Sequence, residues 1–289
     1  MLLYIIIVVL IIILIILYYY YSKLTYKCSS ISCFSFLNIT ERKKILNLIL
    51  YSETNHLYIQ MYKILSNYLK TLNIHHYFYC YNENLVNDYK IVDDIIYIKG
   101  NESLVPGCLD KTLKVFSICK DMDFDYVVRS NISEVINFDL LQKYLQSHCF
   151  KYGGATLLQL QWLDPPSGII DFKYWNTYFI RGNAIIFDRE IFDLVESNKD
   201  EILGYNIVDD VAFGVFLKDK ISTIHYTNER LNVNNIYPDT IFYRNRSYNR
   251  NTDVINMKTI TRKMILKNDN NILFKHNDSY HPNKQDMFV

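Results

Sequence analysis

The chain begins with a continuous apolar run. Residues 2–17 are apolar apart from Tyr4, and four tyrosines at 18–21 extend the run without a charge. A helix of about 20 residues, at ~1.5 Å per residue, reaches ~30 Å, the thickness of one bilayer core. A cleaved signal peptide would need a positive start and small residues before a cut site, and the run has neither. The pattern therefore predicts an uncleaved membrane anchor over residues 1–21.

After the anchor, helical and strand-like patterns alternate. Apolar residues recur at helical spacing over residues 56–72, whereas runs of β-branched and aromatic residues indicate strands. Further helices are predicted at residues 107–119, 138–146, 189–197, 209–217 and 252–266. Strands are predicted at residues 74–81, 91–98, 124–129, 177–187, 221–226 and 240–243. This alternation predicts an α/β fold with a mixed, mainly parallel sheet flanked by helices.

No internal repeat or interior linker divides the chain after the anchor. Residues 22–40 are polar and without clear periodicity, and the stem that they indicate is placed at residues 22–50. The globular domain is predicted at residues 51–266, before a polar tail at residues 267–289. In open α/β sheets, ligands bind at the carboxyl ends of the strands. The residues that follow the strand at 124–129 are therefore expected on the ligand side.

Composition and charge restrict the partners. The formal net charge is +1 with scattered basic residues, so there is no electrostatic basis for binding nucleic acid. The six cysteines include no CxxC pair, and a zinc site is not predicted. The charges nearest to the anchor all follow it, and the positive-inside rule would keep the body of the protein cytoplasmic.

Three short segments contain the candidate chemistry. The segment VVRSNIS at residues 127–133 ends a predicted strand. The segment IRGN at residues 180–183 interrupts an apolar run, and DDVAFG at residues 209–214 opens a helix. A sugar-transferring site needs the same parts in this order. It needs a strand end that faces a nucleotide-sugar, a turn of small residues in its floor, and a carboxylate for the acceptor.

Two of these segments also have plain structural interpretations. Aspartate is a preferred helix N-cap and suits the positive end of the helix dipole, which alone would explain Asp209 and Asp210. The catalytic interpretation is that a carboxylate here takes the proton of an acceptor hydroxyl as general base. Gly182 predicts either a close approach of the backbone or an ordinary β-bulge.

In these segments the chain resembles inverting glycosyltransferases of the β-1,3-galactosyltransferase and fringe type, which are single-pass enzymes with a GT-A fold. It is still more similar to loosely characterised viral and microbial relatives with a VRTN-S signature. The resemblance covers about residues 55–260 and is weak outside the three segments. It implies a GT-A-like fold, a nucleotide-sugar donor, a glycan or protein acceptor, and a lumenal body in the ER or Golgi. The positive-inside rule, in contrast, favours a cytoplasmic body.

The resemblance also assigns roles to residues. Asp210 matches the family's catalytic aspartate, and Asp209 would cap the helix or bind the acceptor. Three residues are expected to face the donor: Arg129, Asn131 and Ser133. Three more are expected in the floor, on the acceptor side: Arg181, Gly182 and Asn183. In the segment FYR at 242–244, Phe242 stands where the relatives have a histidine.

The sequence departs from the family at the metal site. The family's Asp-x-Asp carboxylates hold Mn²⁺ or Mg²⁺ on the donor diphosphate, and Asn131 and Ser133 offer only neutral oxygens there. Three outcomes stay open. The two side chains bind the donor directly while Arg129 or Arg181 neutralises its charge, a metal binds through other ligands, or the activity is lost. No cofactor is assigned, Mn or Mg stays open, and the metal ligands are unknown. The alternative function is an inactive GT-A-fold membrane protein that binds a glycan or a protein partner.

Overall fold

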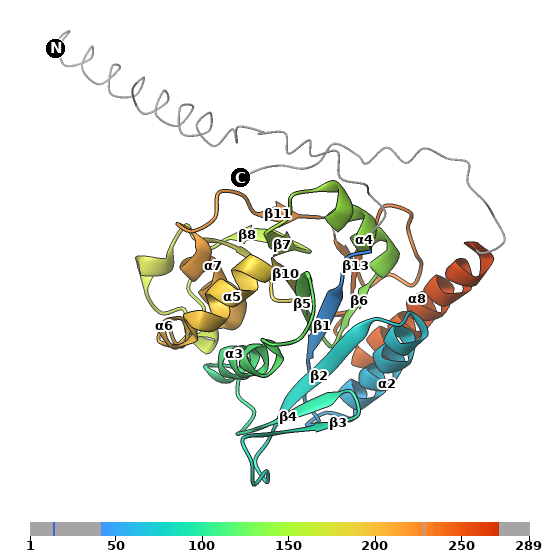
Figure 1. Ribbon diagram of the computed structural model, residues 1–289, viewed down its shortest axis with the longest axis horizontal. Helices are drawn as coiled ribbons and strands as arrows, with labels where there is room; N and C mark the ends of the chain where they lie inside the picture. Colours follow the sequence, from blue (N-terminus) through green and yellow to red (C-terminus); the bar gives the residue numbers. More distant parts are fainter. Residues whose placement is uncertain (1–13, 15–41, 228, 272–289) are drawn as a thin grey trace.

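The computed structural model describes Leu14, residues 42–227 and residues 229–271. Within this part, the central feature is an eight-stranded sheet (Figure 1). From edge to edge its strands are β11 (His225–Tyr226), β7 (Tyr152–Gly154), β10 (Ala184–Asp188), β5 (Tyr126–Asn131), β1 (Ile45–Leu50), β2 (His75–Asn82), β4 (Ile95–Lys99) and β3 (Tyr89–Val92). The pairs β5–β1, β1–β2 and β2–β4 are parallel, whereas β10 and β3 are antiparallel to their neighbours. The predicted mixed, mainly parallel sheet is confirmed.

Helices cover both faces of this sheet (Figure 1). One face is covered by α3 (Gly107–Cys119), α5 (Arg189–Ser197), α6 (Lys199–Leu203) and α7 (Asp209–Leu217). The other face is covered by α2 (His56–Thr71), α4 (Phe138–Ser147) and α8 (Arg250–Asn271). Each helical layer packs on its own buried apolar cluster, so the fold has three layers with a core on each side of the sheet.

β1 lies in the middle of the sheet, although the sequence pattern placed residues 45–50 in the stem. Leu46 and Leu48 belong to the cluster under α3, and Ile45 and Ile49 belong to the cluster under α2. A strand that is buried on both faces shows no alternation of apolar and polar residues. Its short apolar run therefore does not reveal whether the segment is a strand, a helix or neither. The stem boundary at residue 50 is wrong, because the folded body includes β1.

Two of the predicted strands are each divided by a turn. Residues 91–98 fall in β3 and β4, which pair antiparallel around Asp93, a residue with φ 54°. Residues 177–187 divide into β9 (Tyr178–Ile180) and β10, with residues 181–183 between them. The apolar pattern continues through both turns, so periodicity does not reveal them. The second break turns the backbone at the candidate floor.

Two smaller sheets complete the described fold. The first is formed by β12 (Glu229–Leu231), β13 (Phe242–Arg244) and β6 (Glu134–Ile136), with β13 in the middle. The second pairs β8 (Leu157–Gln159) with β9, and two short 3₁₀ helices follow β8, η1 (Pro165–Ser167) and η2 (Phe172–Tyr174). Only two residues separate the end of β5 from the start of β6. The first small sheet is therefore attached directly to the carboxyl end of a central strand.

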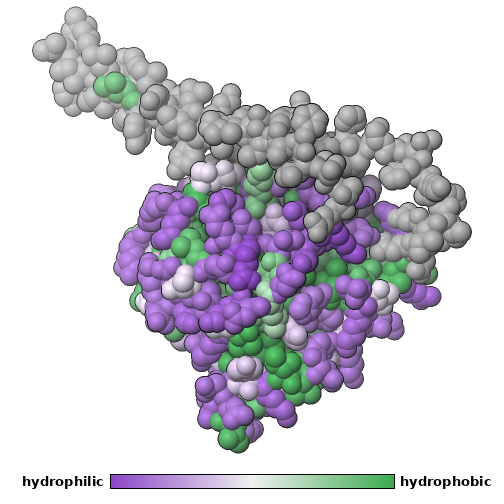
Figure 2. All heavy atoms as spheres, viewed as in Figure 1, coloured by the Kyte–Doolittle hydropathy of each residue, from purple (hydrophilic) through white to green (hydrophobic). Residues whose placement is uncertain are grey.

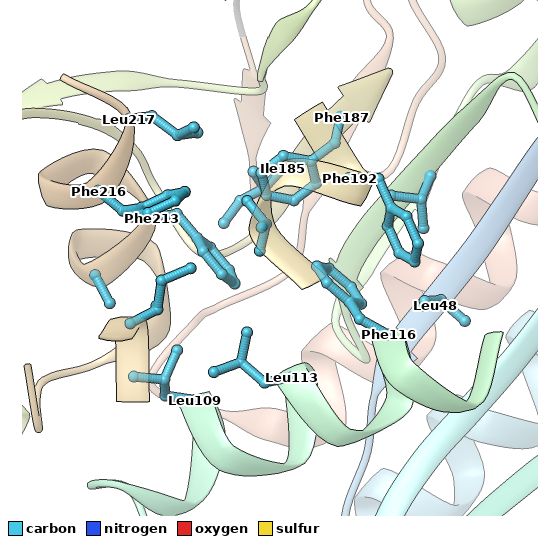
Figure 3. Close-up of a cluster of buried hydrophobic side chains, with 14 of the residues drawn as sticks. Leu48, Leu109, Leu113, Phe116, Ile185, Phe187, Phe192, Phe213, Phe216 and Leu217 are labelled. Atoms are coloured by element: carbon cyan, nitrogen blue, oxygen red, sulfur yellow. The ribbon is translucent and has the colours of Figure 1, made fainter. Parts of the chain in front are cut away.

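Aromatic rings fill the core under α3, α5 and α7 (Figure 3). The ring centroids of Phe187 on β10 and Phe213 on α7 are 5.3 Å apart, and those of Phe116 on α3 and Phe213 are 6.1 Å apart. All three side chains are fully buried. Aromatic contacts of this kind add to the burial of apolar area. They hold α7 against the sheet, and so they fix where α7 begins relative to β5 and β10.

Within the described residues, no helix combines the length and the apolarity that crossing a membrane requires. This corrects the expected single-pass membrane location with a lumenal ER or Golgi body. α8 has 22 residues, but basic, acidic and amide side chains interrupt it throughout. The segment 1–21 that carried the expectation lies outside the described residues apart from Leu14, as do residues 22–41 of the stem and residues 272–289 of the tail.

Figure 2 shows a mainly hydrophilic face. Apolar side chains gather in the lower part of this view, where β3 and β4 lie (Figure 1). The exposed apolar residues of β3 and of the segment just before it include Val86, Ile91 and Val92. β3 is the edge strand of the sheet, and its four residues are all exposed. This edge lies at the opposite end of the sheet order from β10 and β7.

Gly214 makes the contact between α7 and β9 possible. A Cβ atom at this position would lie 2.5 Å from Phe179 Cβ and 2.7 Å from Tyr178 O. We expect Gly214→Ala to lower the free energy of unfolding by about 1–3 kcal/mol, because the helix must move away from the strand. Urea denaturation of the full-length chain would measure this loss. Gly204→Ala is the matched control, since its Cβ would come no nearer than 3.2 Å to an atom of a non-adjacent residue, the distance to Glu201 O. An equal loss in both variants would contradict the packing argument.

Candidate functional site

The end of β5 and the start of α7 meet in a buried ion pair. Arg129 Nη2 lies 2.5 Å from Asp209 Oδ2, and each side chain is only 2% exposed. Arg129 Nη1 also donates a hydrogen bond to the carbonyl of Gly182. A buried charge is stable only when it is paired and hydrogen-bonded. One guanidinium group therefore joins the predicted strand end, helix start and floor, and it is committed to these protein partners.

Asp209 is held by more than this arginine. Its Oδ2 accepts a hydrogen bond from Thr112 Oγ1 at 3.3 Å, and its Oδ1 accepts one from the amide of Asp210 at 3.0 Å. The hydroxyl of Tyr79 lies 2.9 Å from Thr112 Oγ1 and extends the buried polar chain. The arrangement makes Asp209 a fixed partner of Arg129 inside the core.

Asp210 has a different environment from its neighbour. Its Oδ2 accepts a hydrogen bond from the amide of Gly182 at 2.8 Å, and its Oδ1 accepts one from the amide of Val211 at 2.9 Å. The side chain is half-buried, and its burial, together with the negative charge of Asp209, raises the pKa of Asp210 to about 6. A carboxyl group with a perturbed pKa beside a specific charge partner is typical of functional sites.

Gly182 allows this close contact. A Cβ atom on Gly182 would lie 3.0 Å from Asp210 Oδ2 and 3.4 Å from Arg129 Nη1. Any side chain here would therefore press on the carboxylate and on the guanidinium. Of the two interpretations of Gly182, the close approach of the backbone fits this geometry.

Asn131 and Ser133 form a tight turn after β5. Asn131 Oδ1 accepts hydrogen bonds from the amide of Ser133 at 3.3 Å and from its hydroxyl at 3.4 Å. The main-chain amide of Asn131 donates a hydrogen bond to the main-chain carbonyl of Asn183 at 2.8 Å, which holds the turn against the floor. Ser133 is 5% exposed, whereas Asn131 is partly exposed. Asn131 is therefore the more accessible of the two.

This turn does not fit a divalent cation. Mn²⁺ and Mg²⁺ prefer charged oxygens, whereas the turn offers an amide oxygen that already accepts two hydrogen bonds and a buried hydroxyl. Over residues 42–227 and 229–271, no three His, Cys, Asp or Glu side chains are grouped as a metal site. Phe242, at the place of the relatives' histidine, is 1% exposed and belongs to the apolar core.

A second polar network lies beside the turn. Asn183 Nδ2 donates to Glu134 Oε2 at 3.1 Å and to Glu229 Oε2 at 2.7 Å. Arg181 Nη1 lies 2.6 Å from Glu229 Oε1, and Arg244 stands opposite Glu134 in the register of β13 and β6. These five residues are called the floor cluster below. They join the segment between β9 and β10 to the small sheet of β6, β12 and β13.

Glu134 is a buried carboxyl group within the floor cluster. It is 2% exposed, and its Oε1 has no hydrogen-bond partner among the described residues. Burial raises the pKa of Glu134 to about 8, and the nearby charge of Glu229 acts in the same direction. Glu134 is therefore mainly protonated at neutral pH.

The structure brings the predicted site residues together. The carboxylates of Asp209 and Asp210 and the side chain of Arg129 meet at Gly182, and the turn after β5 is bonded to Asn183. Sequence reasoning did not single out Glu134 or Glu229. Glu134 had one signal, a charged residue in the segment ISEVI at 132–136, which is otherwise apolar except for Ser133, whereas Glu229 had none.

Two cavities border α3 away from these residues. One of about 310 Å³ lies where β2 and β4 end, and its lining includes Tyr81, Gly100 and Asp110. Another of about 480 Å³ is lined by residues that include Tyr89 and Leu113. Neither lining contains a predicted site residue. The predicted residues therefore meet through direct contacts rather than around these two cavities.

Comparisons with known proteins give structural likenesses alone. No protein-family profile and no curated protein matches the sequence. A glycosyltransferase involved in the glycosylation of the major capsid of PBCV-1 is 11% identical with a TM-score of 0.41, over 75% of this chain and 99% of that chain. The glycosyltransferase GlyE of Streptococcus pneumoniae TIGR4 is 10% identical with a TM-score of 0.40, over 80% of this chain and 64% of that chain. The inositol-1-phosphate CTP transferase of T. maritima is 10% identical with a TM-score of 0.41, over 76% of this chain and 98% of that chain.

Two of these three neighbours are glycosyltransferases. TM-scores of 0.40 and 0.41 carry no argument about the fold family, the substrate or the activity of this chain. The resemblance to the β-1,3-galactosyltransferase and fringe family stays a prediction. The function is argued from the site.

Arg129→Met tests the buried ion pair. We expect it to lower the free energy of unfolding by about 3–5 kcal/mol, because Asp209 is left buried without its partner. The double variant Arg129→Met, Asp209→Leu should recover part of this loss, because no charge is then buried. Urea denaturation of the single and double variants measures both effects. Additive losses would show that the two side chains are not coupled.

Glu134→Gln should stabilise the protein at pH 9 but not at pH 4. The pKa of Glu134 is about 8 in the folded protein and 4.5 as the ordinary value. The folded state therefore binds more protons between these values, and stability falls as pH rises from 4.5 through 8. Glutamine removes this loss, a gain on the order of a few kcal/mol at pH 9. Urea denaturation at a series of pH values would measure it.

Glu229→Gln is the matched control for this experiment. It removes a carboxylate from the same cluster, but one that forms a 2.6 Å ion pair with Arg181. We expect it to lower stability at pH 7 and to bring no gain at pH 9. If Glu134→Gln changed stability equally at pH 4 and pH 9, Glu134 would not be a buried, protonated carboxyl.

Proposed function

We propose that this protein moves a sugar from a nucleotide-sugar donor to an acceptor hydroxyl with inversion at the anomeric carbon, and that Asp210 is the general base. The main supporting observation is the difference between two adjacent carboxylates. Asp209 is fixed in its ion pair with Arg129, whereas Asp210 is held by two main-chain amides and has a pKa raised to about 6. A general base works best when its pKa lies near the working pH.

The position of Asp210 in the fold also supports this proposal. It lies against the segment between β9 and β10, next to the carboxyl end of β5. Ligands of open α/β sheets bind at the carboxyl ends of strands. A base at this edge is well placed for a substrate bound there.

The proposed reaction is a single displacement. Asp210 accepts the proton of the acceptor hydroxyl while the hydroxyl oxygen forms a bond to the anomeric carbon of the donor sugar. The bond between that carbon and the diphosphate oxygen breaks, and the nucleoside diphosphate leaves with the electron pair. The attack comes from the face opposite the leaving group, so the configuration is inverted.

The other residues receive distinct proposed roles. Asn131, which is partly exposed, contacts the donor, whereas Ser133 shapes the turn that presents it. Arg129 acts as a positioning residue because its guanidinium holds Asp209 and the carbonyl of Gly182. Arg181 and Asn183 form the floor, on the acceptor side.

A second candidate is an inactive protein of the same fold that binds a glycan or a protein partner. The specific observation in its favour is the neutral pair Asn131 and Ser133, at the place where the resembled family holds a metal ion. The purified full-length chain incubated with a panel of nucleotide-sugars and simple glycoside acceptors would separate the two. Release of nucleoside diphosphate with formation of a glycoside is expected. Its absence across the panel favours the inactive protein.

Asp210→Asn should lower kcat for this transfer by about 10²-fold or more, because the amide cannot accept the proton. In the wild type, kcat should fall below pH 6 as Asp210 becomes protonated, by about tenfold per pH unit well below its pKa. Initial rates from pH 4.5 to 8.5 measure both effects. Asp193→Asn is the control, since Asp193 is 52% exposed and pairs with Arg189 on α5. Wild-type turnover in Asp210→Asn would rule out this base.

A further inference from the structure

The diphosphate of the proposed donor carries negative charges that need positive partners. Asn131 and Ser133 are neutral. The guanidinium of Arg129 is 2% exposed and paired with Asp209, so it adds no free positive charge. The missing charge must come from other residues near the turn after β5.

Three arginines belong to the segments that lie beside this turn: Arg181, Arg244 and Arg246. The side chain of Arg181 is 34% exposed, Arg244 is partly exposed, and Arg246 is exposed. Burial lowers the pKa of Arg244, and although the carboxyl groups of Glu229 and Glu134 oppose this, the charges of Arg181 and Arg246 add to it. Arg181 and Arg246 are therefore each within electrostatic reach of Arg244.

The carboxyl groups of the floor cluster do not neutralise these arginines. Glu229 pairs with Arg181 at 2.6 Å. Burial raises the pKa of Glu134 to about 8, so this carboxyl group carries little charge at pH 7. One charged carboxylate, that of Glu229, thus accompanies three arginines, and the net charge of these residues is positive at neutral pH.

Several buried polar atoms at this place lack a partner among the described residues. They include one nitrogen of Arg244, Nη1, and two oxygens, Glu134 Oε1 and Asn183 Oδ1. The side chains of Glu134 and Asn183 are only 2% and 1% exposed. Buried polar groups in proteins are nearly always hydrogen-bonded. Arg244 Nη1 is a hydrogen-bond donor, so its free capacity suits a phosphate oxygen, whereas Asn183 Oδ1 only accepts.

Both arginine-bearing segments are bonded to the turn after β5. The amide of Asn245, next to Arg244, donates to the carbonyl of Ser133 at 2.9 Å. The carbonyl of Asn183, two residues after Arg181, accepts from the amide of Asn131 at 2.8 Å. The arginines are thus fixed on either side of the turn that would face the donor.

We infer that Arg181, Arg244 and Arg246 bind the diphosphate of a nucleoside diphosphate directly, in place of a divalent cation. This inference rests on the proposed function, which puts the donor at the end of β5. The guanidinium group is planar, permanently charged and able to bind two phosphate oxygens at once. It supplies the charge that the neutral turn does not, and donor binding then needs no Mn²⁺ or Mg²⁺.

Isothermal titration calorimetry of the purified full-length chain tests this inference. The probes are UDP, GDP, ADP and CDP, each titrated in EDTA and again in Mn²⁺ or Mg²⁺. We expect at least one of them to bind with the same affinity, within about twofold, in all three buffers, since arginines supply the charge. Arg244→Ala should weaken that binding by about tenfold or more, and Arg244→Lys by less.

Arg230→Ala is the matched control. Arg230 lies in β12 of the same small sheet, but its guanidinium stacks on Tyr237 at 3.9 Å and lies 3.7 Å from Asp239. We expect this variant to keep wild-type affinity. Should Arg244→Ala fail to fold, Arg246→Ala replaces it, because the side chain of Arg246 is exposed.

Three results would overturn the inference. They are binding that requires Mn²⁺ or Mg²⁺, an equal loss of affinity in Arg230→Ala and Arg244→Ala, and no binding of any of the four nucleotides. The proposed function is judged separately. Metal-independent binding without sugar transfer would remove the proposed function and leave the inference. Sugar transfer that depends on Mn²⁺ would support the proposed function and overturn the inference.

Discussion

The arrangement of the candidate site depends on the buried ion pair between Arg129 and Asp209. Taking both charges out of water costs several kcal/mol per ion, and only close pairing with further hydrogen bonds offsets this. Most of this condition is met. Asp209 accepts hydrogen bonds from Thr112 and from the main-chain amide of Asp210, and the carbonyl of Gly182 accepts one from Arg129, whose Nε has no partner among the described residues. Three segments that are far apart in the sequence are thereby held at one point.

The same low-polarity surroundings explain the behaviour of the carboxyl groups nearby. Asp209 is paired directly with Arg129. Burial and the negative charge of Asp209 raise the pKa of Asp210, and the two amides and the more distant charge of Arg129 oppose this only in part. Glu134 is more deeply buried, and the Asn183 amide that it shares with Glu229 brings no positive charge, so its pKa rises further. The roles proposed for these groups follow from their surroundings.

Sequence patterns predicted those parts of the fold that local spacing determines. The helices at residues 107–119, 189–197 and 209–217 were predicted with the bounds that the structure has. Amphipathic spacing marks the first two, whereas the third is apolar nearly throughout and is marked by the aspartate pair that opens it. β1 was missed because both of its faces are buried. The segments around Arg129, Gly182 and Asp210 were singled out by residue type and by resemblance. Glu134 and Glu229 were not, because they meet only through Asn183 across 95 residues of chain.

The way in which Asp210 is held has a consequence for how this protein can diversify. Its two oxygens are bound by the main-chain amides of Gly182 and Val211, and no other side chain donates to them among the hydrogen bonds of the described residues. Main-chain groups are present whatever side chain a position carries. Residues around the carboxylate can therefore be exchanged, and the choice of acceptor altered, while the carboxylate keeps its place, provided that position 182 remains glycine.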